Sequence, residues 1–170
     1  AYASQTHHGI EVFNTISRFA IRDGQVVSAR VAFANDLAAK VNTTAPSISA
    51  QSAILKAAQA LGLQAPVQID QVSAEDNSYV FEASDLSLNT IPVALTYQRT
   101  TDSQYVLAWD LSLYLLDATH YYSVRIDAQT GALVDTHDWV QHCDFGQGSH
   151  QGHNAESVLF APAKSAGSMA

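Results

Sequence analysis

The chain has 170 residues, of which 47% are apolar and 14% charged, so it can bury a sizeable core in one domain or two small ones. Its formal net charge of −8 at pH 7 would repel phosphate backbones and anionic lipids, so we expect neither a nucleic-acid nor a membrane partner. No stretch approaches the roughly 20 apolar residues of a membrane-spanning helix. The single cysteine excludes an internal disulfide.

The first 45 residues are expected to form a small β-rich unit. Short β-prone runs recur through residues 2–33, and Asp23-Gly24 separates two of them. Asp and then Gly suit the two left-handed positions of a type I′ turn, so this dipeptide predicts a hairpin. A polar connector follows over residues 35–48, within which residues 36–40 are compatible with one helical turn.

Residues 49–61 form the clearest predicted helix. Ser47 or Ser49 is a suitable N-cap, and Gly62 is a suitable left-handed C-terminal residue. The apolar positions recur at helical spacing: Ala50, Ala53, Ile54, Ala57, Ala58 and Leu61. Because most of these side chains are small, the helix can lie close to a sheet.

The rest of the chain to residue 140 predicts strands. Apolar β-prone runs occupy residues 67–72, 78–83, 93–99, 104–116 and 120–127. Asp127-Ala128-Gln129-Thr130-Gly131 predicts a hairpin loop before a returning strand at residues 132–140. One helix among hairpin-linked strands, without strand–helix alternation, predicts an α+β fold: a helix packed on a curled antiparallel sheet over residues 46–140.

Residues 141–170 are expected to be a flexible linker rich in Gly and His. This region contributes to the one group of metal-ligating side chains, His137, His142, Cys143, His150 and His153. Thiolate and neutral imidazole both bind zinc, although the spacing matches no structural zinc module. The alternative interpretation is a solvated linker without a metal role.

No catalytic signature is present. The chain lacks G-x-S-x-G, G-x-x-x-x-G-K-[ST], G-x-G-x-x-G, C-x-x-C and H-E-x-x-H. Carboxylates such as Asp110, Asp117 and Asp127 have no second catalytic group at a characteristic spacing. We therefore interpret them as solvated residues at strand ends and as turn caps. We therefore expect that this chain is not itself an enzyme.

Two segments together resemble a known family. The opening residues 2–14, with Gln5 and then Gly9-Ile10-Glu11-Val12-Phe13, followed by the Asp23-Gly24 hairpin, resemble the fungalysin/thermolysin propeptide motif.

The second segment comprises residues 107–111, 120–131 and 138–140. Its Leu107-Ala108-Trp109-Asp110-Leu111 run, its Asp127 to Gly131 turn and its Asp138-Trp139-Val140 end look like the second half of a fungalysin-type prosegment. In that family this half is a PepSY-like, cystatin-like module. The resemblance covers residues 1–140.

The resemblance implies a zymogen prosegment that inhibits a secreted zinc metallopeptidase and assists its folding. The cognate catalytic domain would be the partner, the chain would be secreted, and it would hold no cofactor of its own. Any zinc would come from the partner, with Cys143 and His142 as candidate ligands in trans, because filling the open coordination position inhibits such an enzyme. Blocking the cleft by bulk alone is the other mechanism.

The motif residues themselves have structural explanations. Gly9 and Gly131 suit tight backbone conformations, and Asp127 suits a turn cap. The two tryptophans, Trp109 and Trp139, would fill the core or the interface between the two units.

The sequence is compatible with two other functions. The first is a freestanding secreted PepSY-like binding module without a cognate peptidase. The second is a small α+β-cone enzyme whose pocket would be lined by His120, Tyr121, Tyr122 and Asp110. A downstream H-E-x-x-H segment would favour the prosegment, and a deep cavity with convergent polar groups would favour the enzyme.

Overall fold

The computed structural model describes residues 1–140, and these are mostly strand. The strands are β1 (Tyr2–Ala3), β2 (Thr6–His7), β3 (Ile10–Val12), β4 (Ser17–Arg22), β5 (Gln25–Arg30), β6 (Asp70–Glu75), β7 (Ser78–Glu82), β8 (Ile91–Arg99), β9 (Tyr105–Tyr114), β10 (Tyr121–Asp127) and β11 (Leu133–Asp138). The helices are α1 (Leu37–Lys40) and α2 (Ala50–Ala60). None of the helices in this part of the chain is long and apolar enough to cross a membrane.

The α+β prediction is wrong, because the fold is mostly β. Strands make up 45% of the described residues and helices 11%, and the strands form two sheets. The error has a physical cause: α2 makes its main contacts with β9, β10 and β11 alone, so it covers only part of one sheet. The pairings of β1, β2 and β3, which the sequence does not reveal, extend the β structure further.

The larger sheet is organised around β8. One edge of β8 pairs with β9 over residues 93–99, and β9, β10 and β11 follow as antiparallel neighbours. The other edge is shared: β7 pairs antiparallel with residues 91–94, and β3 pairs parallel with Thr96 and Tyr97. The antiparallel meander was predicted, whereas the parallel insertion of β3 was not. Through β3 the N-terminal segment becomes part of the main sheet.

The core lies between α2 and the inner face of this sheet. The helix is confirmed, with Ser49 as its N-cap accepting a hydrogen bond from the Ser52 amide and with Gly62 at φ 70°. Every second residue of β9 points inward and is buried: Tyr105, Leu107, Trp109, Leu111 and Leu113. The buried side chains of α2 are Ala50, Ala53, Ile54, Ala57 and Ala58.

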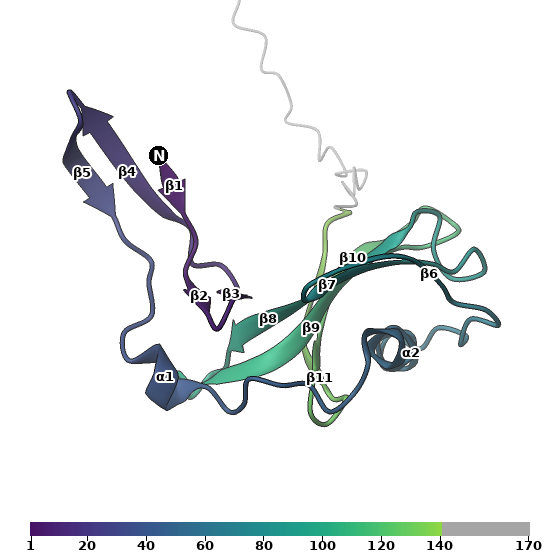
Figure 1. Ribbon diagram of the computed structural model, residues 1–170. Helices are drawn as coiled ribbons and strands as arrows, with labels where there is room; N and C mark the ends of the chain where they lie inside the picture. The colour runs from purple at the N-terminus through teal and green to yellow at the C-terminus, as the bar shows by residue number, and fades with distance from the viewer. Residues whose placement is uncertain (141–170) are drawn as a thin grey trace, which may run out of the picture.

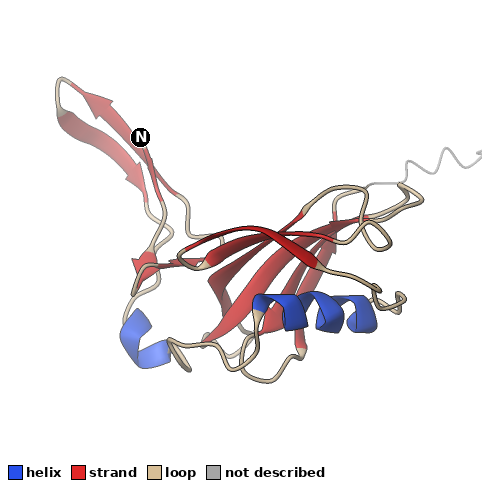
Figure 2. Cartoon of the chain, turned by 45° about the vertical axis from the view of Figure 1, so that its right-hand side comes forward, coloured by secondary structure: helices blue, strands red, loops and turns tan. Residues whose placement is uncertain are grey.

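The hairpin of β4 and β5 projects away from the main sheet (Figures 1 and 2); residues 17–30 are called the arm below. Asp23 and Gly24 have φ values of 50° and 76°, as the predicted type I′ turn requires. Together with β1 the arm forms the second, three-stranded sheet. At its base the Gln5 side chain accepts from the Ala34 amide (2.6 Å) and donates to the Ala34 carbonyl (3.0 Å).

Candidate partner-binding surfaces

The first candidate surface is the apolar face of the arm. In the register of β4 and β5, Phe19 lies opposite Ala29 and Ile21 lies opposite Val26, so these four side chains share one face. Ile21 is 55% exposed and Val26 is 59% exposed. Both side chains thus keep more than half of their surface exposed within the described part of the chain, as does Val31 just beyond β5, whereas Phe19 is half-buried.

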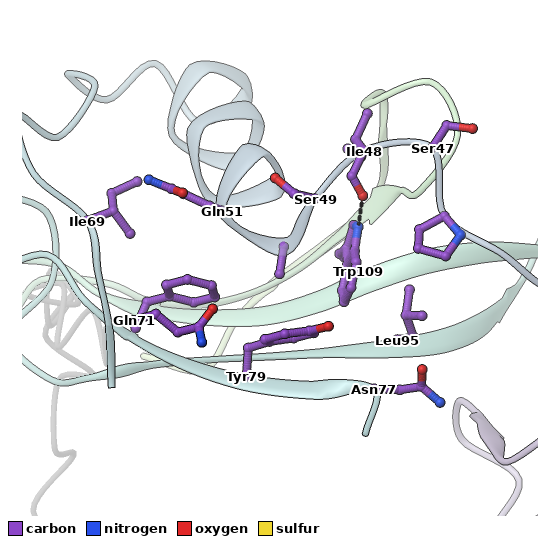
Figure 3. Close-up of a pocket in the computed structure, with 13 residues that line it drawn as sticks. Ser47, Ile48, Ser49, Gln51, Ile69, Gln71, Asn77, Tyr79, Leu95 and Trp109 are labelled. Atoms are coloured by element: carbon purple, nitrogen blue, oxygen red, sulfur yellow. Dashed lines mark hydrogen bonds between the residues drawn. The ribbon is translucent and has the colours of Figure 1, made fainter. Parts of the chain in front are cut away.

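The second candidate surface is a groove of about 580 Å³ beside the start of α2 (Figure 3). Its floor carries Tyr79, Leu95 and Trp109, and the Trp109 indole N–H donates to the Ile48 carbonyl at 3.0 Å. Tyr79 meets the Trp109 ring edge to face, with ring centroids 5.8 Å apart. The rim adds Pro46, Ser47, Ser49, Ala50, Gln51, Ile69, Gln71, Asn77 and Phe81.

The chemistry of this groove favours binding over catalysis. Its lining residues, all in the described part of the chain, include no carboxylate, histidine, lysine or cysteine. Neutral amides and hydroxyls above aromatic rings can hydrogen-bond a ligand and bury an apolar group, but they supply neither a general base nor an activated nucleophile.

An ion-pair cluster on the outer face of the sheet joins the N-terminal segment to the rest. The Arg125 side chain is 2% exposed and donates to Asp135 (2.7 Å), Ser123 (2.6 Å) and Asp110 (3.3 Å). Its guanidinium carbon lies 4.4 Å from the centre of the Phe13 ring, which follows β3. Burial raises the pKa of Asp110, and the charge of Arg125 opposes this shift. The cluster has a structural role, because the Arg125 guanidinium pairs with both carboxylates and holds the Phe13 ring against the sheet.

The residues of the enzyme hypothesis do not converge on one pocket. His120 Nδ1 lies 2.5 Å from Asp138 Oδ2, and the His120 ring stacks on Tyr122. The hydrogen bond with His120 lowers the pKa of Asp138, and the Val140 and Tyr121 amides add to this effect.

Asp110 is distant from this group. It pairs with Arg125, four positions along β10 from Tyr121, or about 13 Å. Of the four predicted residues, His120, Tyr121, Tyr122 and Asp110, none lines the groove of Figure 3.

The predicted metal ligands cannot be placed. Cys143 and His142, like His150 and His153, lie outside the described residues. His137 is exposed on β11. Within residues 1–140 no group of three or more His, Cys, Asp or Glu side chains is arranged to hold a metal ion. The assignment of Cys143 and His142 therefore stays a prediction.

The motif residues behave largely as turn and core residues. Asp127 Oδ1 accepts from the amides of Gln129 (2.7 Å) and Thr130 (2.9 Å), which confirms it as a turn cap. Gly131 has φ 74°, and Trp109 is buried. The two predicted places were the core and the interface between the units: Trp109 takes the core, whereas Trp139 is 49% exposed, packs edge to face on Tyr121 and lies outside the core.

Comparison with known proteins gives little further guidance. No family model matches the chain, and no curated protein matches it significantly. Among solved structures, the Bacillus megaterium YpeB C-terminal domain is similar with a TM-score of 0.41 and 16% identity, over 81% of this chain and 49% of that one. The chain thus spans about half of that structure.

Proposed function

We propose that the chain is the prosegment of a secreted zinc metallopeptidase, acting as its inhibitor and as its intramolecular folding chaperone. The observation that carries the proposal is the uncovered apolar face of the projecting arm. The resemblance of residues 1–140 to the fungalysin-type prosegment says which partner would cover that face.

The arm is unusual for a module that works alone. Strand β1 pairs only with Ser17 and Arg18, so the rest of the arm is a two-stranded ribbon, which is marginally stable in water by itself. Contiguous exposed apolar side chains mark a surface that meets another protein. Burying the exposed part of Ile21, Val26 and Val31 against a partner would stabilise the complex by about 1–1.5 kcal/mol for each side chain. The arm is therefore suited to cover a cleft.

The same contact explains both activities. The prosegment would bind the native catalytic domain and not the unfolded one. By mass action, this binding shifts the folding equilibrium of the catalytic domain toward the native state. Bound over the substrate cleft, it also excludes substrate. Inhibition by bulk requires no metal ligand from this chain.

The test is to add the purified chain in trans to the catalytic domain encoded with it. We expect slower peptide hydrolysis and a higher refolding yield of the denatured catalytic domain. Ile21→Ser should weaken inhibition, whereas the control Val67→Ser, at a side chain that is 95% exposed outside the arm, should not. Equal hydrolysis and equal yield with and without an excess of chain would contradict the proposal.

Ligand capture of the partner zinc by Cys143 or His142 is a separate part of the proposal. A thiolate binds zinc well and would occupy the open position where water is activated. If Cys143 acts in this way, Cys143→Ser in the intact precursor lowers latency. Unchanged latency, before and after a thiol-modifying reagent, would leave steric blocking as the mechanism.

A freestanding binding module is the second candidate, and the groove of Figure 3 favours it. Its aromatic floor and neutral rim suit a ligand or peptide without any peptidase. The reading frame downstream of residue 170 distinguishes the two functions. A frame that continues into an H-E-x-x-H segment supports the prosegment, and one that stops soon after residue 170 supports the binding module.

A further inference from the structure

The face of the arm opposite the apolar one is basic. Arg18 lies directly opposite Arg30 in the register of β4 and β5, and Arg22 follows Arg18 at the same-face spacing of four residues along β4. All three side chains are exposed. These residues, Arg18, Arg22 and Arg30, are called the arginine face below, and the bare apolar side chains lie on the other side of the same ribbon.

The arginine face has no partner within the described residues. The salt bridges of residues 1–140 involve His120 and Arg125, and no side-chain hydrogen bond of Arg18, Arg22 or Arg30 occurs there. Like charges placed directly opposite one another destabilise a strand pair. The arm therefore carries an electrostatic cost that an external carboxylate would relieve.

The charge distribution of the chain makes this face distinctive. The whole chain has eight basic residues against sixteen acidic ones, and three of the eight lie on the arginine face. Residues 31–140, in contrast, carry twelve acidic and four basic side chains. An acidic partner surface is thus attracted by the arm and repelled by the rest of the chain, which fixes the orientation in which the two meet.

The two-sided arrangement also selects the kind of partner. A membrane offers anionic headgroups and an apolar interior from one side only, so it cannot contact both faces of one ribbon. A protein cleft has two walls. Guanidinium groups bind carboxylates in a bidentate fashion, which makes Asp and Glu side chains their natural partners on such a wall.

We infer that the arginine face docks on a carboxylate-bearing wall of the peptidase cleft, while the apolar face packs on the opposite wall. This inference rests on the proposed function. It adds that charge, and not the apolar contact alone, determines how the arm enters the cleft.

The experiment measures binding of the intact chain to the catalytic domain encoded with it at several salt concentrations. The variant Arg18→Gln/Arg22→Gln/Arg30→Gln is compared with Lys40→Gln/Lys56→Gln/Arg99→Gln, which removes the same three charges away from the arm. We expect Kd to rise at least tenfold for the first variant and less than twofold for the second. The salt dependence of Kd should flatten in the first variant alone.

A third variant, with all three arginines replaced by lysine, separates charge from fold. It should recover part of the affinity, since it keeps the charge and loses the bidentate geometry. Circular dichroism of each variant confirms that the fold is intact.

The outcomes are distinguishable. Tight wild-type binding with equal Kd and equal salt dependence in both glutamine variants overturns this inference and leaves the proposed function in place. No wild-type binding at all overturns both. Co-sedimentation of the wild-type chain, but not of the arginine variant, with phosphatidylserine vesicles would assign the face to a membrane and overturn the inference as well.

Discussion

Strand β9 and the arm follow the same alternating pattern but end in opposite environments. In β9 the inward residues face α2 and are buried, whereas in the arm Ile21 and Val26 are more than half exposed. Both sequences are good strands, because alternation reports which residues share a face. It does not report whether another element lies over that face.

The difference implies two levels of stability within one chain. The main sheet with α2 buries a continuous core, while the arm has few contacts beyond its own hairpin and β1. Segments with few buried contacts open at low free-energy cost. We therefore expect the arm to behave as a locally weak element until a partner covers it.

The largest expected effect comes from opening a cavity in the core. Leu111→Ala should lower the free energy of unfolding by about 2–5 kcal/mol, since Leu111 is buried between β9 and the helix. Ile21→Ala on the arm should cost much less, about 0.5 kcal/mol, because more than half of the side chain is already exposed to water. Urea denaturation of the two variants measures this contrast, and similar losses at both sites would break it.

The next prediction compares the buried Arg125 with the exposed Arg18. Arg125→Ala leaves Asp110 and Asp135 facing each other without their cation, and we expect a loss of about 2 kcal/mol at pH 7. Arg18→Ala should cost almost nothing in the free chain, because its side chain has no described partner.

The pH dependence of Arg125→Ala has a defined sign. Without Arg125, burial and the negative charges of Asp135 and Glu11 raise the pKa of Asp110 unopposed, so its folded-state pKa lies further above the ordinary value. The folded state then binds the proton more tightly than the unfolded state, so the stability of the variant, relative to wild type, should rise as the pH falls from 7 toward 4. A deficit that is constant with pH would contradict this.

A smaller effect is expected at the two hairpin glycines, Gly24 and Gly131, which both have positive φ. A Cβ at Gly131 would lie 3.2 Å from Lys56 atoms, while a Cβ at Gly24 meets nothing within 4 Å. Gly131→Ala should lower global stability by about 1–2 kcal/mol. Gly24→Ala should loosen the arm in hydrogen exchange with little change in global unfolding. A global loss at Gly24 as large as at Gly131 would show that the arm folds with the core.

The smallest effect concerns Asp138. Its hydrogen bond with His120 lowers its folded-state pKa, so its stabilisation is present above the ordinary pKa of aspartate and is lost as the pH falls through the folded value. Asp138→Asn should therefore lower the Tm at pH 6, and this difference should shrink on acidification. Thermal melts of both proteins between pH 6 and pH 2 measure it, and a difference that grows at low pH would refute the assignment.

Local signals in the sequence predicted much of this structure. Ser49 and Gly62 marked the ends of α2, and Asp23-Gly24 and Asp127 marked two turns, because caps and turns depend on a few adjacent residues. The parallel pairing of β3 with β8 joins residues about 85 positions apart and left no local signal. The sequence analysis did not predict this pairing, and it treated one helix as half of the architecture. For these two reasons it predicted an α+β fold where the fold is mostly β.

The candidate surfaces were harder to predict for a related reason. The alternation of Arg18, Ala20 and Arg22 with Phe19 and Ile21 is visible in the sequence and would have shown a ribbon with one basic and one apolar face. Its exposure depends on what the rest of the fold leaves uncovered. The groove depends likewise on where α2 begins relative to β7, β8 and β9, which only the tertiary structure gives.

Hydrogen exchange on the chain, alone and with the catalytic domain encoded with it, tests most directly whether the arm is completed by a partner. We expect amides of residues 17–30 to exchange quickly in the free chain and to become at least tenfold slower in the complex, while amides of β9 and α2 stay protected in both. An arm as protected as β9 in the free chain, or unchanged by the catalytic domain, would contradict the central claim.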